Sequence, residues 1–202
     1  MLYSLLERIV QLDTDLFFVL NVKVQNGFLD FLMPILTNLN YWRIPLALMV
    51  VALAVFGGKR GRIAIALLIV GITISDQICN SLIKPMVGRI RPCHVLENVH
   101  LLVNCTRSFS FPSSHATNMF TGTIILSYVY RRWRIVFLFI AFLVAYSRIY
   151  VGVHYPFDML GGIVLGIICA WLVIVLYKLL SGKYPRISFK EDAVRSEAEI
   201  RV

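Results

Sequence analysis

A histidine and an aspartate four positions apart, His154 and Asp158, are well placed in this sequence to do chemistry. Pro156 lies between them, and because proline is favoured in the first turn of a helix, we expect a turn at 154–155 and a new helix from residue 156. Asp158 would then lie in a first helical turn, where its carboxylate can accept a hydrogen bond from an imidazole N–H. That bond would fix the tautomer of His154 and leave its other nitrogen as a base or nucleophile. Taken alone, the pair is equally well read as a histidine beside a capping aspartate.

Three basic residues in other segments predict that an anion binds near this pair. Lys84 and Arg91 stand at the end of an apolar stretch, in the sequence KPMVGRIRP, and two cations at this spacing suit a phosphate better than a metal. Arg148 can add a bidentate contact through its planar guanidinium. Each residue also has a simpler alternative, because Lys84 can reach the membrane interface with its ammonium and Arg148 can form an ordinary ion pair.

The sequence PSSH at 112–115 adds a helix start to this set. Backbone N–H groups in the first turn of a helix lack helical partners, and together with a serine hydroxyl they form an anion site. Ser113 is expected to be the capping residue, which is also its simplest structural explanation. His115 follows in the first turn, where it would face the same anion.

The composition indicates an integral membrane protein. Of 202 residues, 58% are hydrophobic and 15% charged, against about 45–50% apolar residues in soluble proteins. One domain is expected over 1–202, with a solvated tail over 181–202. The first 22 residues include the acidic Glu7, Asp13 and Asp15 and no small-residue cleavage site, so we expect an amphipathic interfacial helix over 1–22 and not a removable signal.

The apolar segments predict an all-α, polytopic bundle of six transmembrane helices. The first segment is short and contains Asp30 and Pro34, so whether it fully spans is left open. The expected spans are 27–39, 44–56, 63–83, 113–130, 135–153 and 156–180.

Basic residues in short loops predict the orientation. The turns at 59–62 and 131–134, together with the early tail, are rich in lysine and arginine. We therefore expect that face to be cytoplasmic, with both termini on it. The opposite face would carry the residues named above.

Three motifs now make the sequence resemble a known family. The patterns K-x6-R-P at 84–92, P-S-x-H at 112–115 and S-R-x5-H-x3-D at 147–158 resemble the signature of the type 2 phosphatidic acid phosphatase superfamily. The resemblance implies that His154 is a nucleophile forming a phosphohistidine, that Asp158 orients it and that His115 protonates the leaving group. It also implies that the phosphoryl oxygens are held by Lys84, Arg91, Ser113, Ser114 and Arg148.

One position departs from the family pattern. Members usually have glycine between the serine and histidine of the second motif, and here the residue is Ser114. A helical conformation does not need glycine, so we expect serine to be tolerated. If the position required a positive φ, the phosphate site would be compromised.

From these motifs we expect a phosphatase acting on a lipid phosphate or diphosphate at the outer leaflet of a bacterial cytoplasmic membrane. Undecaprenyl diphosphate, phosphatidylglycerophosphate, phosphatidate and lipid A 1-phosphate are candidates by resemblance. A vanadate-dependent haloperoxidase has a similar oxyanion pocket but is soluble, and a non-catalytic phospholipid binder or transporter is the alternative from another class. We expect no metal and no cofactor, because lysine and arginine can supply the charge that phosphoryl transfer needs. The expected partners are the lipid substrate and membrane lipids, not nucleic acid.

The four cysteines divide into two kinds. Cys79 and Cys169 fall inside apolar segments as small apolar residues, whereas Cys93 and Cys105 both fall in the outer loop. An extracytoplasmic loop permits a disulfide, which would hold Arg91 near its working position. Two free thiols are the alternative, since spacing alone does not establish the geometry.

Overall fold

The structure is a computed structural model that describes residues 2–184, 188 and 189. All of its regular elements are helical, as predicted. Most of the tail expected at 181–202 lies outside the described residues. The helices are α1 (Leu2–Phe18), η1 (Val19–Lys23), α2 (Gly27–Thr37), α3 (Leu39–Val55), α4 (Gly58–Gln77), η2 (Ile78–Ile83), α5 (Lys84–Val87), α6 (Pro92–Val95), α7 (Ser114–Val129), η3 (Arg131–Trp133), α8 (Arg134–Tyr150) and α9 (Pro156–Lys183).

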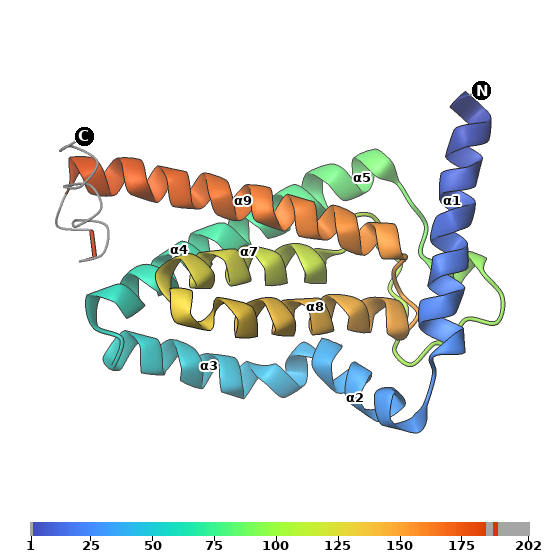
Figure 1. The fold of residues 1–202 in the computed structure, drawn as a ribbon, viewed down its shortest axis with the longest axis horizontal. Helices are drawn as coiled ribbons and strands as arrows, with labels where there is room; N and C mark the ends of the chain where they lie inside the picture. Colours follow the sequence, from blue (N-terminus) through green and yellow to red (C-terminus); the bar gives the residue numbers. More distant parts are fainter. Residues whose placement is uncertain (1, 185–187, 190–202) are drawn as a thin grey trace.

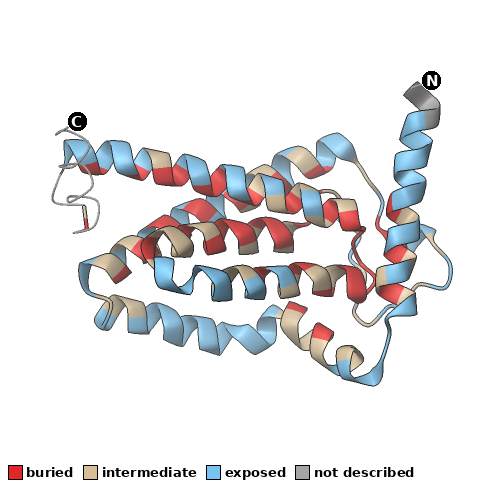
Figure 2. Cartoon of the chain, viewed as in Figure 1, coloured by how far each residue is buried: buried red, intermediate tan, exposed pale blue. Residues whose placement is uncertain are grey.

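Helix α7 lies at the centre of the bundle, between α4, α8 and α9 (Figure 1). Half of its residues are buried and none is exposed, in contrast to the largely exposed α3 (Figure 2). Two glycines let α9 approach α7 closely. A Cβ on Gly162 would lie 2.6 Å from the carbonyl oxygen of Ser113, and one on Gly166 would lie 2.5 Å from that of Thr117. This close packing fixes the start of α9 against the start of α7, where the motif residues lie.

Three helical segments are long and apolar enough to cross a membrane: Gly58–Val95, Arg131–Tyr150 and Pro156–Lys183. A fourth would be the pair Leu5–Lys23 and Gly27–Thr37, which is bent by 115°. The apolar α3 is shorter, at 17 residues. The many large hydrophobic side chains exposed along these helices suit a lipid surround.

Two of the six expected spans, 27–39 and 44–56, correspond to the helices α2 and α3. α2 and α3 follow one another in the same direction along the bundle (Figure 1), joined at Asn38, which has an extended backbone. Thr37 at the end of α2 contacts Arg148 at the site end of α8, and α3 continues from there toward the start of α4. Among the described residues, length and composition thus support three membrane spans, or four with the bent pair, and the prediction of six is supported only in part.

The N-terminal helix corrects a second prediction. α1 lies across the end of the bundle at which α9 begins, whereas α9 ends at the far end (Figure 1), so α1 and the end of α9 do not share a side as predicted for the termini. The reason is a polar contact, because Asp13 accepts a hydrogen bond from the backbone N–H of Phe157 at 2.8 Å. The expected helical character of 1–22 is confirmed by α1 and η1.

One face of α1 and η1 is buried against the bundle. Asp13, Phe17 and Asn21 recur every four residues and are each 0% exposed. The Asn21 side chain donates to the carbonyl of Tyr150 at 2.6 Å and accepts from the backbone N–H of His100 at 2.9 Å. The other face exposes a second apolar stripe, formed by Leu5, Ile9, Leu12 and Leu16. α1 is therefore amphipathic, and its polar buried positions join it to the loops around the motif residues.

Candidate active site

The turn before α9 builds the central pair as the sequence predicted. His154 lies in a turn between α8 and α9, and Asp158 lies in the first turn of α9, which begins at Pro156. The Nδ1 atom of His154 is 3.3 Å from Oδ2 of Asp158. The backbone N–H of Tyr155 donates to the same oxygen at 2.8 Å. This one carboxylate oxygen therefore both caps the start of α9 and contacts the imidazole.

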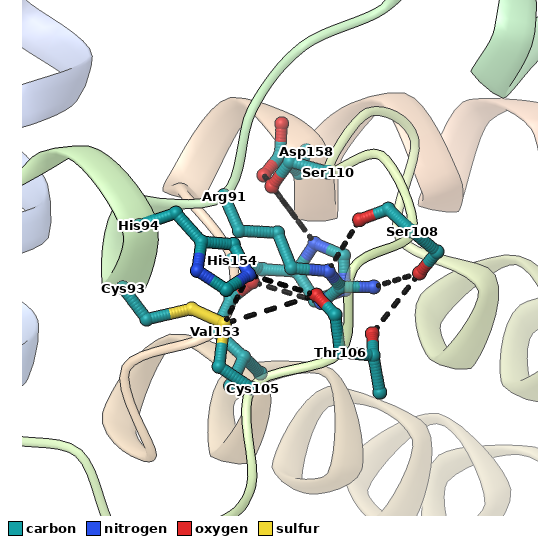
Figure 3. Close-up of a disulfide and its surroundings, with 10 residues drawn as sticks. All are labelled: Arg91, Cys93, His94, Cys105, Thr106, Ser108, Ser110, Val153, His154 and Asp158. Carbon is teal, nitrogen blue, oxygen red and sulfur yellow. Dashed lines mark hydrogen bonds and ion pairs between the residues drawn. A yellow bond between two sulfur atoms is a disulfide. The ribbon is translucent and has the colours of Figure 1, made fainter.

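The tautomer of His154 is set from two sides, by Asp158 and by Arg91. Nη1 of Arg91 lies 3.0 Å from Nε2 of the imidazole (Figure 3). Because a guanidinium can only donate, Nε2 must accept, and the ring proton resides on Nδ1, which faces Asp158. Burial lowers the pKa of His154 to about 3, against the opposing effect of the Asp158 carboxylate. The imidazole is therefore neutral near pH 7, with the lone pair of Nε2 directed at a cation.

Arg91 itself is held by the outer loop. Its Nε donates to the carbonyl of Ser108 at 2.8 Å and its Nη2 to the Ser108 hydroxyl at 2.9 Å. The disulfide between Cys93 and Cys105 joins the two arms of this loop (Figure 3), which confirms the predicted pairing. The loop is thus cross-linked at Cys93, two residues after Arg91, and its Ser108 accepts two hydrogen bonds from the guanidinium.

Two further cations lie beside this pair. Lys84 is 5% exposed and interacts electrostatically with Arg91 and Arg148. In the described part of the chain no carboxylate forms a salt bridge with it. Arg148 donates from Nη1 to the Thr37 hydroxyl, but its buried Nε has no hydrogen-bond partner. Buried cations with donors to spare are costly unless an anion joins them, so this region is built to receive one.

The start of α7 completes the surroundings of His154. Ser113 is the N-cap residue, and its hydroxyl accepts from the backbone N–H of Ala116 at 3.5 Å. His115 is half-buried and interacts electrostatically with Arg148, His154 and Lys84. The structure therefore brings the residues from all three motifs to one end of the bundle.

Ser114 is compatible with the helix despite replacing the usual glycine. Its hydroxyl donates to Oδ1 of Asn80 at 2.8 Å, which turns the side chain toward η2. Among the non-glycine residues that the structure describes, Asn98 alone has a positive φ. Ser114 therefore has an ordinary helical backbone, and the position does not demand glycine.

Comparison with known proteins agrees with this geometry. The family model of the PAP2 superfamily matches residues 64–181, which include every motif residue. The chain belongs to the PAP2 superfamily. The resemblance of the three motifs is thus confirmed over more than half of the protein.

Two relatives of known name and one solved structure are similar to this PAP2 protein over most of its length. It is 31% identical over 188 residues to the lipid A 4'-phosphatase of Bacteroides thetaiotaomicron, covering 89% of this chain and 83% of the relative. It is 35% identical over 150 residues to undecaprenyl-diphosphatase BcrC of Bacillus subtilis, covering 73% and 74%. The crystal structure of a transmembrane PAP2-type phosphatidylglycerolphosphate phosphatase from Bacillus subtilis superposes with a TM-score of 0.64 at 27% identity, covering 84% of this chain and 86% of that one. This PAP2 protein is accordingly a multi-pass membrane protein with bacterial relatives.

Sequence reasoning missed three residues of the PAP2 site. Ser110 donates to Oδ2 of Asp158 and lies 3.4 Å from Nδ1 of His154. Arg89 donates to Oδ1 of Asp158 at 2.9 Å, and Asp13 pairs with Arg89 at 2.6 Å. Arg89 falls at an unspecified position of the first motif, and its only signal was a third cation in KPMVGRIRP. Asp13 is too distant in sequence for any motif to include it.

One group of potential metal ligands occurs among the described residues, and it lies outside the motif residues. Cys93, His94 and Cys105 place their ligand atoms within 4.8 Å of one another. Both sulfur atoms belong to the disulfide, however, and a metal needs the thiolate form. This group is therefore not a metal site in the oxidised protein, and metal-independent activity stays a prediction.

Proposed function

We propose that this PAP2 protein is a membrane hydrolase that removes phosphate from a lipid phosphomonoester or diphosphate through a phosphohistidine at His154. The observation that carries the proposal is the arrangement of the buried, neutral imidazole. Its Nδ1–H faces Asp158, and its Nε2 lone pair faces Arg91, 3.0 Å away. A phosphoryl group held by the guanidinium would lie where that lone pair can attack it.

In the first step, Nε2 of His154 attacks phosphorus and the bond from phosphorus to the lipid oxygen breaks. His115, protonated once the anionic phosphate lies beside it, gives its proton to the departing oxygen, so the lipid leaves as an alcohol or, from a diphosphate, as a monophosphate. The positive charge that develops on the imidazole is offset by Asp158, which keeps the Nδ1–H bond throughout.

In the second step, His115 takes a proton from water, whose oxygen attacks the phosphorus of the phosphohistidine. The bond from phosphorus to Nε2 breaks, inorganic phosphate leaves and both histidines return to their initial protonation states. The net reaction consumes one water and releases one phosphate. No metal ion is needed, because phosphoryl transfer depends mainly on positioning and on charge stabilisation.

The charge stabilisation is assigned to the cations and to the start of α7. Lys84, Arg91 and the unpartnered Nε of Arg148 would contact the phosphoryl oxygens. Ser113 and the backbone N–H of Ser114 would add the donors of a helix N-terminus. Their positions, fixed before the substrate arrives, favour the transition state in which charge spreads over these oxygens.

The substrate class is proposed from the relatives and from the place of the site. The relatives' names specify lipid A 4'-phosphate, undecaprenyl diphosphate and phosphatidylglycerophosphate. Phosphatidate and lipid A 1-phosphate are further candidates, the latter named for a relative from Rhizobium etli. All are phosphates on apolar anchors, which suits a site at one end of a lipid-facing bundle.

The orientation follows from the opposite end of the bundle. Arg60 at the start of α4 donates to the carbonyl of Val129 at the end of α7 at 2.7 Å, so the basic turns at 59–62 and 131–134 lie together, away from the site. We propose that this basic end is cytoplasmic and that the site, with α1, faces the periplasm or exterior. The whole chain is proposed to form one domain.

Phosphate release from a lipid panel tests the proposal. Protein purified in detergent is incubated with each of the five candidate lipids, with and without excess EDTA, and inorganic phosphate is measured. We expect release from at least one lipid, unchanged by EDTA, lost in His154→Gln and kept in His94→Gln, a matched histidine in the outer loop. Binding of a lipid without release by wild type would favour the non-catalytic alternative, and full activity of folded His154→Gln would reject the mechanism.

A further inference from the structure

We propose that Asp13 and Arg89 are positioning residues which hold the Asp158 carboxylate in place for His154, so that the N-terminal helix completes the active site. This inference rests on the proposed function and adds to it two residues that no motif specifies. Arg89 pairs with Asp158 and Asp13 pairs with Arg89, so both would act through Asp158.

The three charged groups form a continuous chain from α1 to α9. Asp13 Oδ2 accepts from Nη2 of Arg89 at 2.6 Å, and Nη1 of the same guanidinium donates to Oδ1 of Asp158 at 2.9 Å. The other oxygen of Asp158 is the one that faces His154. Oδ1 of Asp158 thus binds Arg89, and Oδ2 contacts His154. By holding Oδ1, Arg89 fixes the rotation of the carboxylate so that Oδ2 faces the imidazole.

Asp13 is needed to hold Arg89 in this position. The carboxylate of Asp13 is buried, with 1% of its side chain exposed, while the Arg89 side chain is 23% exposed. Without Asp13, the guanidinium would have water on one side and a single carboxylate on the other. Asp13 Oδ1 is also occupied, because it accepts from the backbone N–H of Phe157 at 2.8 Å. The same residue therefore fixes both Arg89 and the first turn of the helix that carries Asp158.

Aromatic contacts restrain the guanidinium further. It lies 3.9 Å above the centre of the Tyr155 ring, within the range of a cation–π contact. The Tyr155 ring in turn packs against Phe17 of α1, with ring centres 5.6 Å apart. Arg89 is thus enclosed by α1 and by the residue that follows His154 in the sequence.

Removal of either residue leaves a buried charge without its partner. Loss of Arg89 places two carboxylates near each other with no cation between them, and loss of the Asp13 charge leaves Arg89 free to move away from Asp158. Because both act through one chain, their effects should not add. A purely structural role for α1 predicts additive losses that follow stability instead.

A double-mutant cycle tests whether Asp13 and Arg89 act together through Asp158. Asp13→Asn, Arg89→Gln and the double variant are compared for kcat and KM on the lipid that wild type hydrolyses. Asp15→Asn is the matched control, an exposed acid on the same helix whose partner is Gln11. We expect Arg89→Gln to lower kcat by about 10- to 100-fold, with little change in KM. Losses of this size are typical when a residue that orients a functional side chain by hydrogen bonding is removed. Asp13→Asn should lower kcat less, and the double variant should fall no further than Arg89→Gln. Arg89→Lys should recover part of kcat, and Asp15→Asn should match wild type.

A readout without substrate separates this inference from the proposed function. The ¹⁵N chemical shifts of His154 at pH 7 report which ring nitrogen carries the proton. We expect Nδ1–H in wild type and in Asp15→Asn, and a mixture of tautomers in Arg89→Gln and Asp13→Asn. If wild type hydrolyses no lipid phosphate, the proposed function fails, and these shifts still show whether Asp13 and Arg89 position Asp158. Unchanged shifts, additive losses in kcat, or wild-type kcat in folded Asp13→Asn would each overturn this inference.

Discussion

The two ends of the bundle are held together by different forces. At the far end, α4, α7 and α9 pack through apolar side chains, among them Ala64, Ile125, Val129 and Val173, each 5% exposed or less. At the site end, the buried groups include Asp13, Lys84, Arg91, His154 and Asp158. Both ends are buried in the same helices (Figure 2). A change at the far end should therefore cost stability, because packing is lost, whereas a change at the site end should cost catalysis, because charges and hydrogen bonds are displaced.

The largest effect should come from Asp158→Asn. An asparagine keeps the size of the side chain, but its NH2 group can donate to Nδ1 and favour the tautomer with the proton on Nε2, which has no lone pair for attack. We expect kcat to fall by roughly 10⁴-fold, as for the corresponding change in other His–Asp pairs. Phosphate release measures it, with gel filtration to confirm the fold. A loss of less than tenfold would show that Asp158 does not set the tautomer.

Arg148→Ala should follow in size. Its Nε is the buried donor that lacks a protein partner, so the phosphoryl group is its expected acceptor. We expect a loss in kcat of about 10²–10³-fold, typical of one donor aimed at a developing oxyanion. The matched control is Arg134→Ala, an exposed arginine at the other end of the same helix. Equal kcat values for the two variants would contradict the assignment.

Ile125→Ala should reverse the pattern. Ile125 is 0% exposed in the apolar cluster of the far end. Its truncation leaves a cavity that costs about 2–5 kcal/mol of unfolding free energy, with kcat close to wild type. Unfolding in mixed micelles of increasing sodium dodecyl sulfate content measures the free energy of unfolding. Phosphate release measures kcat. A large loss of kcat without loss of stability would break the distinction between the two ends.

Ser114→Gly should have the smallest effect. The backbone at Ser114 is helical and its hydroxyl is directed to Asn80, so removing the side chain should leave kcat near wild type. The lower helix propensity of glycine predicts a cost of about 1 kcal/mol in stability at most. Steady-state kinetics on the same lipid checks this. A tenfold gain in kcat would mean that the serine obstructs the phosphate.

Local sequence patterns predicted the site better than they predicted the path of the chain. Pro156, Ser113 and the motif residues act through turns and helix starts that short segments determine, and these appear where expected. The direction of α2 and α3 depends on the break at Asn38 and on contacts such as that between Thr37 and Arg148. Such contacts join residues more than a hundred positions apart, so apolar periodicity alone does not predict them.

The supporting charges of the site show the same limit. Arg89 and Ser110 lie near motif residues in sequence, yet nothing in their spacing shows that they reach Asp158. Asp13 was visible only as an acidic residue in an amphipathic helix. Its role emerges when α1 lies across the bundle and places a buried carboxylate beside Arg89. Long-range ion pairs are fixed by tertiary packing and leave no local signal.

Trapping the phosphorylated enzyme tests the account most directly. Wild-type protein is mixed with a lipid labelled with ³²P in its phosphate, denatured within milliseconds in alkali, where phosphohistidine survives, and digested for mass spectrometry. The account predicts one labelled peptide with the phosphoryl group on Nε2 of His154, absent from His154→Gln and accumulating in His115→Ala with a lipid diphosphate, whose better leaving group needs no proton. A phosphoryl group on another residue, or active enzyme that never becomes labelled under these conditions, would contradict it.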